Sequence, residues 1–357
     1  MNFDYNEEQQ LLADSVRRFL AKDYEFEARR KIVASEAGWG PKVWSMFAEM
    51  GLTGLPFSPD YGGFGGGAID LIGVMEAFGE ALVVEPYLPT VMAGQLIARS
   101  PQAKSILPAI VEGKVKLAFA HGEKGSRYDL SAVNTIARKS GDAWLLQGEK
   151  ACVVGAPMAD KLVVSARSTD GIGLFLTDNQ NGKAYRTLDE MRAADIAFKG
   201  AKAEPLQGGL ALIEEVTDFA TALICAGAVG AMKFACDTTL EYLKTRKQFG
   251  VPIGFFQALQ HRMVDMVIDC EQARSMASLA CARVDAAGDP GERARIVSAA
   301  KIKIADNARH ISQESVQLHG GMGMSEELKI SHTFRRLTVA ASQFGDADHH
   351  LARFASL

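Results

Sequence analysis

The sequence lacks several features that mark common classes of protein. Its 357 residues include 39 Lys and Arg against 43 Asp and Glu, so no basic excess exists to hold nucleic acid non-specifically. No uncharged apolar run approaches the roughly 18 residues that a membrane span needs. The longest such run covers residues 222–232 and contains two glycines. We therefore expect neither a nucleic-acid partner nor a membrane span.

The chain also lacks the cysteine and leader patterns of exported proteins. Its five cysteines include no Cys-x-x-Cys pair, and their apolar surroundings favour reduced thiols that fill the core. The first residues, MNFDYNEE, are acidic and contain neither the basic nor the apolar region of a secretion signal. We therefore expect a cytoplasmic protein.

Hydrophobic periodicity divides the chain into three parts. From residue 7 to about 97, apolar residues recur every three to four positions, as in amphipathic helices, apart from a Gly- and Pro-rich loop at residues 51–67. From about residue 115, short alternating runs between turn residues predict a small antiparallel β-domain. Helical periodicity returns after Gly209, with one helix expected over about 254–287. We expect domains at residues 1–113, 114–206 and 207–357.

The first candidate ligand site is the segment TRKQFGVPI at residues 245–253, which joins two predicted helices. Arginine offers a planar fork for a phosphate, glutamine a neutral donor and phenylalanine a flat face, while Gly and Pro allow a tight turn. This combination suits a nucleotide pyrophosphate. A purely structural corner between two helices is the alternative.

Two further segments near the C-terminus carry candidate residues. QLHGGMGM at residues 317–324 follows a predicted helix, and its glycines allow backbone N–H groups to approach a phosphate or an adenine. A helix C-cap is the alternative there. GDADHH at residues 345–350 has the composition of a metal site, but its aspartates would equally cap the last helix. Adjacent histidines diverge by about 100° on a helix, so we expect no metal.

Together these segments resemble the acyl-CoA dehydrogenase family over essentially the whole chain. RKQFGVPIGFFQ at residues 246–257 resembles its helix-turn-helix signature and QLHGGMG at residues 317–323 its late glycine motif, with shorter matches at residues 7–12 and 148–150. Within the family, the chain is similar to the small-subunit type of pimeloyl-CoA dehydrogenase. The resemblance implies a mainly α fold with a central β-barrel domain, placed between an N-terminal helical domain and a C-terminal four-helix bundle.

The resemblance also implies FAD bound non-covalently between subunits, an acyl-CoA substrate, and an electron-transfer flavoprotein as electron acceptor. The flavin ring would lie between the β-domain and the C-terminal bundle, near residues 119–123 and 150–155. The implied reaction is α,β-desaturation, in which a carboxylate within about 3 Å removes the α-proton while the β-hydride moves to flavin N5. The implied contacts with the ADP half of a neighbouring subunit's flavin are Arg246, Gln248, Phe249 and Gln257. Gln317, Gly320 and Gly321 would contact the adenine, and Val153 and Val154 would lie beside the flavin ring.

The sequence departs from the family pattern where the chemistry is expected. Counted forward from the glycine motif, the usual catalytic Glu falls on Phe344, and the alternative Glu position falls on Ala220. Neither side chain can take a proton. In the β-domain, Gly122 replaces the Thr of a Thr-Glu pair, and Cys152-Val153-Val154 replaces the Trp/Phe-Ile-Thr element beside the flavin. Ser126 is the match to the family's substrate-contacting serine.

Three hypotheses follow from these departures. In the first, the chain is an enzyme subunit in a homo-oligomer or in a heteromer with a paralogous large subunit. Its base then comes from that partner or from a shifted carboxylate, which is Asp346, Asp218 or Asp348. In the second, the chain is a flavin-dependent monooxygenase on the same fold, which needs no α-base. In the third, it is a non-catalytic structural subunit.

Overall fold

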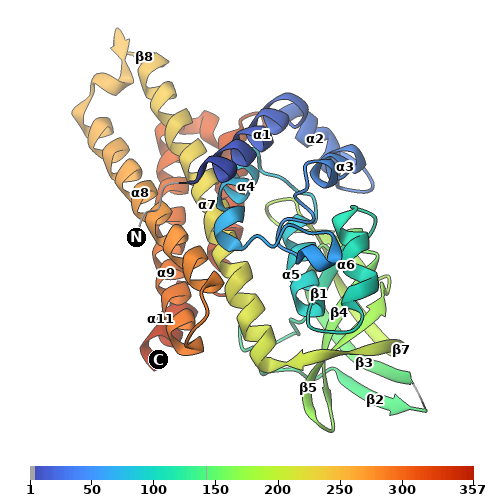
Figure 1. Ribbon diagram of the computed structural model, residues 1–357. Coiled ribbons are helices and arrows are strands. Elements are labelled where there is room, and N and C mark those ends of the chain that lie inside the picture. Colours follow the sequence, from blue (N-terminus) through green and yellow to red (C-terminus); the bar gives the residue numbers. More distant parts are fainter. Residues whose placement is uncertain (1–4, 142) are drawn as a thin grey trace. The chain divides into compact units, whose positions relative to one another are not determined.

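A computed structural model describes residues 5–141 and 143–357. By its internal contacts the chain divides into two compact units, each made of segments that are distant in the sequence (Figure 1). The first unit holds the described residues up to Arg29 together with residues 68–83 and 221–357. The second holds residues 30–67 and 84–220. Two helices, α2 (Phe26–Ala34) and α7 (Leu210–Thr245), run through the division.

The first unit is a bundle of helices. α9 packs against α8, α10 and α11, and α4 packs against α1 and α8. The core is built mostly from alanine, methionine and cysteine side chains, whose small or unbranched shapes allow close helix packing. Besides most of α7, the helices are α1 (Glu7–Asp23), α4 (Ala68–Ala81), α8 (Gln257–Asp285), α9 (Pro290–His319), α10 (Lys329–Ser342) and α11 (Ala347–Ser356).

Glycine allows the backbones of α4 and α7 to touch. A Cβ placed on Gly79 would lie 1.8 Å from the carbonyl oxygen of Gly227, and one on Gly230 would lie 1.9 Å from that of Glu76. Among the described helices, α7 is long and apolar enough to cross a membrane, but 72% of its most apolar window is buried inside the protein. Its apolar residues therefore form the core of the bundle.

The second unit combines helices with one seven-stranded sheet. The strands lie in the order β1-β4-β2-β3-β7-β5, with β6 paired to β7 and a further pairing between β4 and β5. The helices are α3 (Pro41–Glu49), α5 (Tyr87–Ile97) and α6 (Ala103–Val111), with short 3-10 turns at η1 (Pro59–Tyr61) and η2 (Ala156–Met158). The strands are β1 (Leu117–Ala120), β2 (Ile136–Ser140), β3 (Ala143–Val154), β4 (Lys161–Ser168), β5 (Gly171–Asp178), β6 (Lys183–Arg186) and β7 (Arg192–Gly209).

The predicted order of helices, strands and helices is confirmed, whereas closure of the sheet into a barrel stays a prediction. The predicted antiparallel pairing holds for most neighbouring strands, but β1 and β2 both run parallel to β4. Two other strands separate β1 from β4 in the sequence, so no tight turn fixes their direction. β2 and β6 give little signal in the sequence, because most of their residues are exposed and show little apolar alternation.

The helix expected over 254–287 begins later than its periodicity indicates. Before it lie a two-stranded hairpin, β8 (Lys247–Gln248) with β9 (Val251–Pro252), and a 3-10 turn, η3 (Ile253–Phe255). α8 ends at Asp285, and the segment at residues 288–291 that follows starts α9. Asp289 caps α9 by accepting the N–H groups of Gly291 and Glu292, and Pro290 lies in the first turn.

Candidate functional site

The segment predicted to bind a pyrophosphate forms an exposed hairpin in the first unit. Gln248 pairs with Val251 across a two-residue turn, and both turn residues, Phe249 and Gly250, have positive φ, of 54° and 84°. Such turns favour glycine or asparagine, so Phe249 is strained there. Its side chain is 91% exposed, so no packing inside the described chain accounts for it. The other residues predicted here are also exposed: Arg246, Gln248 and Gln257.

The diglycine turn lies at the carboxyl end of α9. Gly320 has φ 62° and ψ −145°, a conformation open to glycine, and its N–H donates to the carbonyl oxygen of Gln317. The helix C-cap that was the alternative interpretation of this segment is therefore present. A cap does not explain Gly321. A Cβ on Gly320 or Gly321 would meet no atom within 4 Å, whereas one on Gly323 would lie 2.6 Å from a carbonyl oxygen. The turn thus leaves room for another molecule beside its backbone.

An aromatic contact brings the hairpin and the diglycine turn together. Tyr242 lies one helical turn before Arg246, and His319 directly precedes Gly320. Their rings stack with centroids 4.4 Å apart, and the Tyr242 hydroxyl donates to the carbonyl oxygen of His319 (3.4 Å). Tyr242 lies just outside the segment at residues 245–253, and His319 lies inside the segment at residues 317–324 but was given no role there. Exposed arginine, glutamine and open glycine backbone at one end of the bundle fit the phosphates and adenine of FAD.

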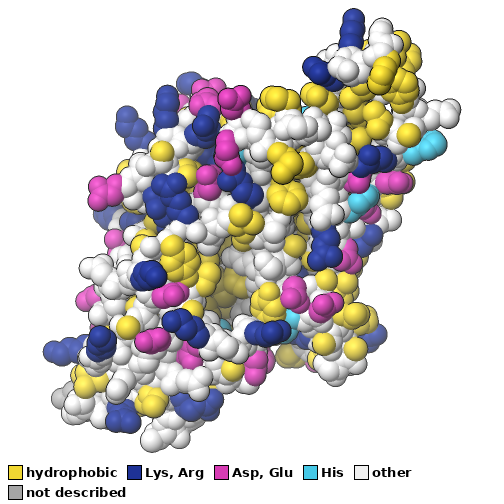
Figure 2. All heavy atoms as spheres, turned by 180° about the vertical axis from the view of Figure 1, so that it is seen from behind, with side chains coloured by type: hydrophobic (Ala, Val, Ile, Leu, Met, Phe, Trp, Pro, Cys, Tyr) yellow, Lys and Arg dark blue, Asp and Glu magenta, His cyan; other side chains and the backbone are white. Residues whose placement is uncertain are grey.

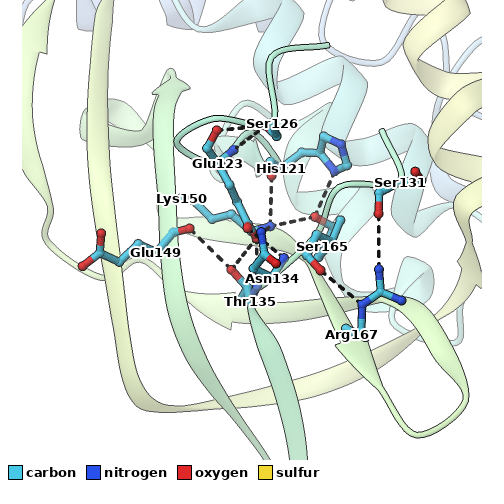
Figure 3. A network of polar contacts seen from close by, with 11 residues as sticks. His121, Glu123, Ser126, Ser131, Asn134, Thr135, Glu149, Lys150, Ser165 and Arg167 are labelled. Atoms are coloured by element: carbon cyan, nitrogen blue, oxygen red, sulfur yellow. Dashed lines mark hydrogen bonds and ion pairs between the residues drawn. The ribbon is translucent and has the colours of Figure 1, made fainter. Parts of the chain in front are cut away.

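A buried ion pair joins several strands of the second unit (Figure 3). The fully buried Lys150 ammonium on β3 donates to Glu123 Oε1 (2.8 Å), the carbonyl oxygen of His121 (2.9 Å) and Ser165 Oγ (3.0 Å). His121 Nδ1 lies 2.9 Å from the same hydroxyl. Burial, and then the charge of Lys150, lower the pKa of His121 to about 4. The imidazole is therefore neutral at pH 7, and the positive charge beside Glu123 is that of Lys150.

Glu123 closes the loop that follows β1. Its carboxylate accepts the N–H groups of Asn134 (2.8 Å) and Thr135 (2.9 Å) and the hydroxyl of Thr135 (2.8 Å). Burial by itself raises the pKa of Glu123, but hydrogen bonds from Lys150, Thr135 and Asn134 outweigh it and lower that pKa to about 2. Ser126 lies in the same loop, where its hydroxyl donates to the carbonyl oxygen of Glu123 (2.8 Å). Its contact with substrate stays a prediction.

The element expected beside the flavin ring lies on a bulge in β3. The pairing of β3 with β7 shifts register between Lys150 and Val153, and Cys152 takes a positive φ of 52°. Val153 is buried and Val154 half-buried, and neither carries a hydroxyl, so hydrogen bonds to a flavin here have to come from the backbone. The bulge also exposes Cys152, so the expectation of a packing thiol is wrong for this one of the five cysteines. The roles of Val153 and Val154 stay predictions.

The turn at residue 344, the predicted position of the base, is held by side chains from two other helices. Phe344 has a left-handed φ of 60°, and its carbonyl oxygen lies 3.1 Å from His350 Nε2 on α11. The buried Lys301 ammonium on α9 donates to the carbonyl oxygens of Ala340 (2.7 Å) and Ala341 (3.0 Å), which end α10. The backbone at residue 344 is therefore fixed, while its phenyl side chain offers no proton acceptor.

The carboxylates considered as a shifted base differ in their surroundings. Asp346 caps α11, because its Oδ1 accepts the N–H of His349 at 2.9 Å. The N-cap that was the alternative interpretation of this aspartate is therefore present, and a catalytic role for Asp346 stays a prediction. Asp218 is buried on α7, two residues before the buried Ala220, and Asp348 is exposed.

Replacing Asp346 separates its capping role from its basicity. We expect Asp346→Ala to lower the free energy of unfolding by about 1 kcal/mol, because alanine cannot accept the His349 N–H. Asp346→Asn should keep most of that free energy, since asparagine caps helices as well as aspartate does. Urea unfolding of both variants measures the difference. An equal loss in the two variants would contradict the capping role.

Of the two histidines beside this cap, His350 is buried in the packing. His350 Nδ1 lies 3.2 Å from Ser298 Oγ, and its other ring nitrogen faces the Phe344 carbonyl oxygen. Burial, followed by the charge of Lys301, lowers the pKa of His350 to about 3. Across residues 5–141 and 143–357, no group of three or more His, Cys, Asp or Glu side chains could hold a metal ion.

Comparison with known proteins covers nearly the whole length of the chain. Models of the acyl-CoA dehydrogenase N-terminal, middle and C-terminal domains match residues 6–114, 118–203 and 207–355. A 3-(aryl)acrylate reductase of Clostridium sporogenes is 29% identical over 93% of this chain and 94% of its own. The caffeyl-CoA reductase-Etf complex subunit CarC of Acetobacterium woodii is 28% identical over 94% of each chain. A solved structure of a variant of the steroid ACAD Tcur3481-Tcur3483 is 29% identical with a TM-score of 0.90, covering 98% of this chain and 97% of that one.

Proposed function

Because this chain belongs to the acyl-CoA dehydrogenase family, an oxidoreductase family whose cofactor is FAD, we propose that it is a subunit of an enzyme that interconverts an acyl-CoA and its α,β-unsaturated form. The observation that carries this proposal is the surface on which the Tyr242–His319 contact joins the exposed hairpin to the open diglycine turn. The proposed domain boundaries are those at residues 1–113, 114–206 and 207–357. The finer resemblance to the pimeloyl-CoA dehydrogenase small subunit stays a prediction.

The proposed cofactor contacts lie on both units of the chain. When bound, FAD exchanges a hydride with the β-carbon of the substrate. The hairpin and the diglycine turn would hold the ADP half of a neighbouring subunit's flavin through Arg246, Gln248, Phe249, Gln257, Gln317, Gly320 and Gly321. The backbone of Val153 and Val154 would face the ring of this chain's own flavin, and Ser126 would contact the substrate.

An apolar groove beside the hairpin supports association with another chain. The groove has a volume of about 600 Å³ and runs between the end of α7, the hairpin and the first half of α8. Figure 2 shows hydrophobic side chains gathered around the projecting hairpin at the upper right. Its lining includes the exposed side chains of Leu240, Phe255, Val264, Val267 and Ile268. Exposed apolar area of this kind marks interaction surfaces, so we propose a homo-oligomer or a heteromer with a paralogous large subunit.

The catalytic base is the part of the proposal that distinguishes this chain within its family. Removal of an α-proton needs a carboxylate placed within hydrogen-bonding reach of it, and neither Phe344 nor Ala220 supplies one. We propose that the partner subunit supplies the carboxylate. Asp346 is the alternative on this chain. An electron-transfer flavoprotein is the proposed electron partner, since one relative is named as a subunit of a complex with Etf.

The anaerobic visible spectrum of the purified chain tests this function. We expect a yellow protein whose flavin absorbance is bleached by acyl-CoA only after a paralogous subunit with an intact Glu is added. Bleaching without the partner would place the base on this chain, and its loss in Asp346→Asn, which keeps the α11 cap, would identify Asp346. Oxygen consumption on reduction by NADH or reduced flavin would favour a monooxygenase. A colourless chain that binds a yellow partner would favour the structural subunit.

Removing one guanidinium tests the cofactor contact on the hairpin. We expect Arg246→Gln to weaken FAD binding by about 10- to 100-fold, because a charge-assisted hydrogen bond to phosphate is lost. Lys247→Gln is the matched control, since Lys247 is adjacent, exposed and equally charged. FAD affinity is measured by quenching of flavin fluorescence. Equal affinities of the two variants would remove Arg246 from the site.

A further inference from the structure

Four of the five cysteines lie where α7 packs against α8 in the first unit, and the function proposed above gives them no role. The two on α7 are 11 residues apart, and so are the two on α8. Since 11 residues make about three helical turns, the two cysteines of each helix share one face. The equal spacing predicts two facing pairs across antiparallel helices, which are Cys236 with Cys270 and Cys225 with Cys281.

Hydrogen bonds show that these pairs do face each other. The Cys236 thiol donates to the carbonyl oxygen of Met266 (3.6 Å), which lies one helical turn before Cys270. The Cys281 thiol donates to the carbonyl oxygen of Ala222 (3.6 Å), three residues before its own partner cysteine. The two helices are antiparallel, because the later residues of α8 meet the earlier residues of this part of α7. We call Cys236 and Cys270 the outer pair and the other two cysteines the inner pair.

Small side chains allow the two helices to approach closely along this seam. Buried alanines lie between the cysteines of each helix, and they include Ala228, Ala231 and Ala235 on α7 and Ala273 and Ala277 on α8. The distance between packed helices depends on the side chains at their contact. A disulfide requires two Cα atoms within about 7 Å, so this seam favours one where two cysteines face each other.

The two pairs differ in their access to solvent. Cys236 and Cys270 are 5% and 7% exposed, whereas Cys225 and Cys281 are fully buried. A side-chain hydrogen bond to Cys270, followed by burial, raises the pKa of Cys236, so the thiols of the outer pair are in direct contact. Neither of them lines the apolar groove beside the hairpin. An oxidant in solution therefore meets the outer pair and not the inner one.

We propose that the outer pair is a redox site, in which Cys236 and Cys270 form a reversible disulfide that ties α7 to α8. The oxidant is a small-molecule disulfide such as glutathione disulfide. One cysteine thiolate attacks a sulfur of this molecule and releases one small thiol, and the second cysteine then displaces the other small thiol. The two cysteine sulfurs are oxidised and the two sulfurs of the oxidant are reduced. The protons lost by the cysteines end on the two released thiols.

The position of this bond gives it a structural consequence. The hairpin of β8 and β9 lies between Cys236 and Cys270 in the chain, so the disulfide closes a loop that contains the hairpin. Closing a loop restricts the conformations of the segment inside it. Oxidation would therefore restrain the segment that carries Arg246. The bond itself does not depend on the function proposed above.

Treating the full chain with glutathione disulfide tests this site. The measurements use Cys152→Ala, since the exposed Cys152 thiol would react with the oxidant by itself. At mildly alkaline pH, which favours thiolates, we expect this protein to lose two thiols and about 2 Da in mass, because two hydrogens leave when one S–S bond forms. Peptide mapping without reduction should recover Cys236 joined to Cys270, and dithiothreitol should restore both thiols.

Two further substitutions in the same background provide the controls. Cys270→Ala should abolish the internal bond, whereas Cys281→Ala changes the inner pair of the same seam and should leave the bond in place. Thiols that stay reduced, glutathione attached to either outer cysteine without an internal bond, or a bond between other cysteines would overturn the inference. The proposed function would stand after any of these results, because FAD binding is measured separately and does not require the bond.

Discussion

Replacing Phe344 with glutamate is expected to raise the rate at which acyl-CoA bleaches the flavin of the isolated chain by about 10²- to 10⁴-fold. The residue lies at the predicted base position, and its turn is held by the contacts of His350 and Lys301. Because phenylalanine already accepts the left-handed φ of 60°, glutamate adds no new backbone strain there. Anaerobic stopped-flow absorbance measures the rate.

The control for this gain is Phe344→Gln, which has the same length and polarity but cannot take the proton. A rate increase in the glutamate variant that is absent from the glutamine variant would show that only the base is missing from this chain. Equal rates in the two variants would count against an otherwise complete active site on it. They would favour the non-catalytic subunit instead.

Replacing Glu123 with glutamine is expected to lower the free energy of unfolding by about 3 to 5 kcal/mol, because it leaves the fully buried Lys150 ammonium without its counter-charge. The neutral amide also has a single oxygen, which cannot replace a carboxylate that accepts from Lys150, Asn134 and Thr135. Chemical unfolding followed by circular dichroism measures the loss.

Removing both charges provides the control for this effect. We expect Glu123→Gln/Lys150→Met to recover much of the loss, since no unpaired charge then remains buried. Losses that simply add in the double variant would show that the pair is not the cause.

The pKa of Glu123 also predicts how the free energy of unfolding depends on pH. It is about 2 in the folded chain against an ordinary 4.5, so the wild type should lose this stabilisation as the pH falls from about 4.5 toward 2, and the variant should not.

The candidate site was predictable where its signal is local in the sequence. The turn at residues 249 and 250, the cap at Gly320 and the aspartate cap at residue 346 all depend on a few consecutive residues, so composition and spacing indicated each of them. For the same reason, the sequence could not decide between a ligand or catalytic site and a structural turn or cap at these positions. A short segment shows which conformation it adopts, but it does not show whether space for a ligand remains beside it.

Contacts between distant residues were not accessible in this way. The pairing of Lys150 with Glu123 joins residues 27 positions apart, and the Tyr242–His319 contact spans 77. The parallel pairing of β1 with β4 and the exposure of Cys152 on a bulge likewise depend on which strands become neighbours. None of these contacts follows from the residues next to either partner in the chain.

By itself, the sequence determined the family and the order of helical and β regions, and it predicted that no carboxylate stands at the base positions, because residue types and their spacing carry this information. Only the tertiary structure decided that the hairpin and the diglycine turn meet, that Gly321 borders open space, and that the Glu123 carboxylate forms an ion pair with a buried lysine. Those facts depend on which distant surfaces pack together and on which groups water can still reach.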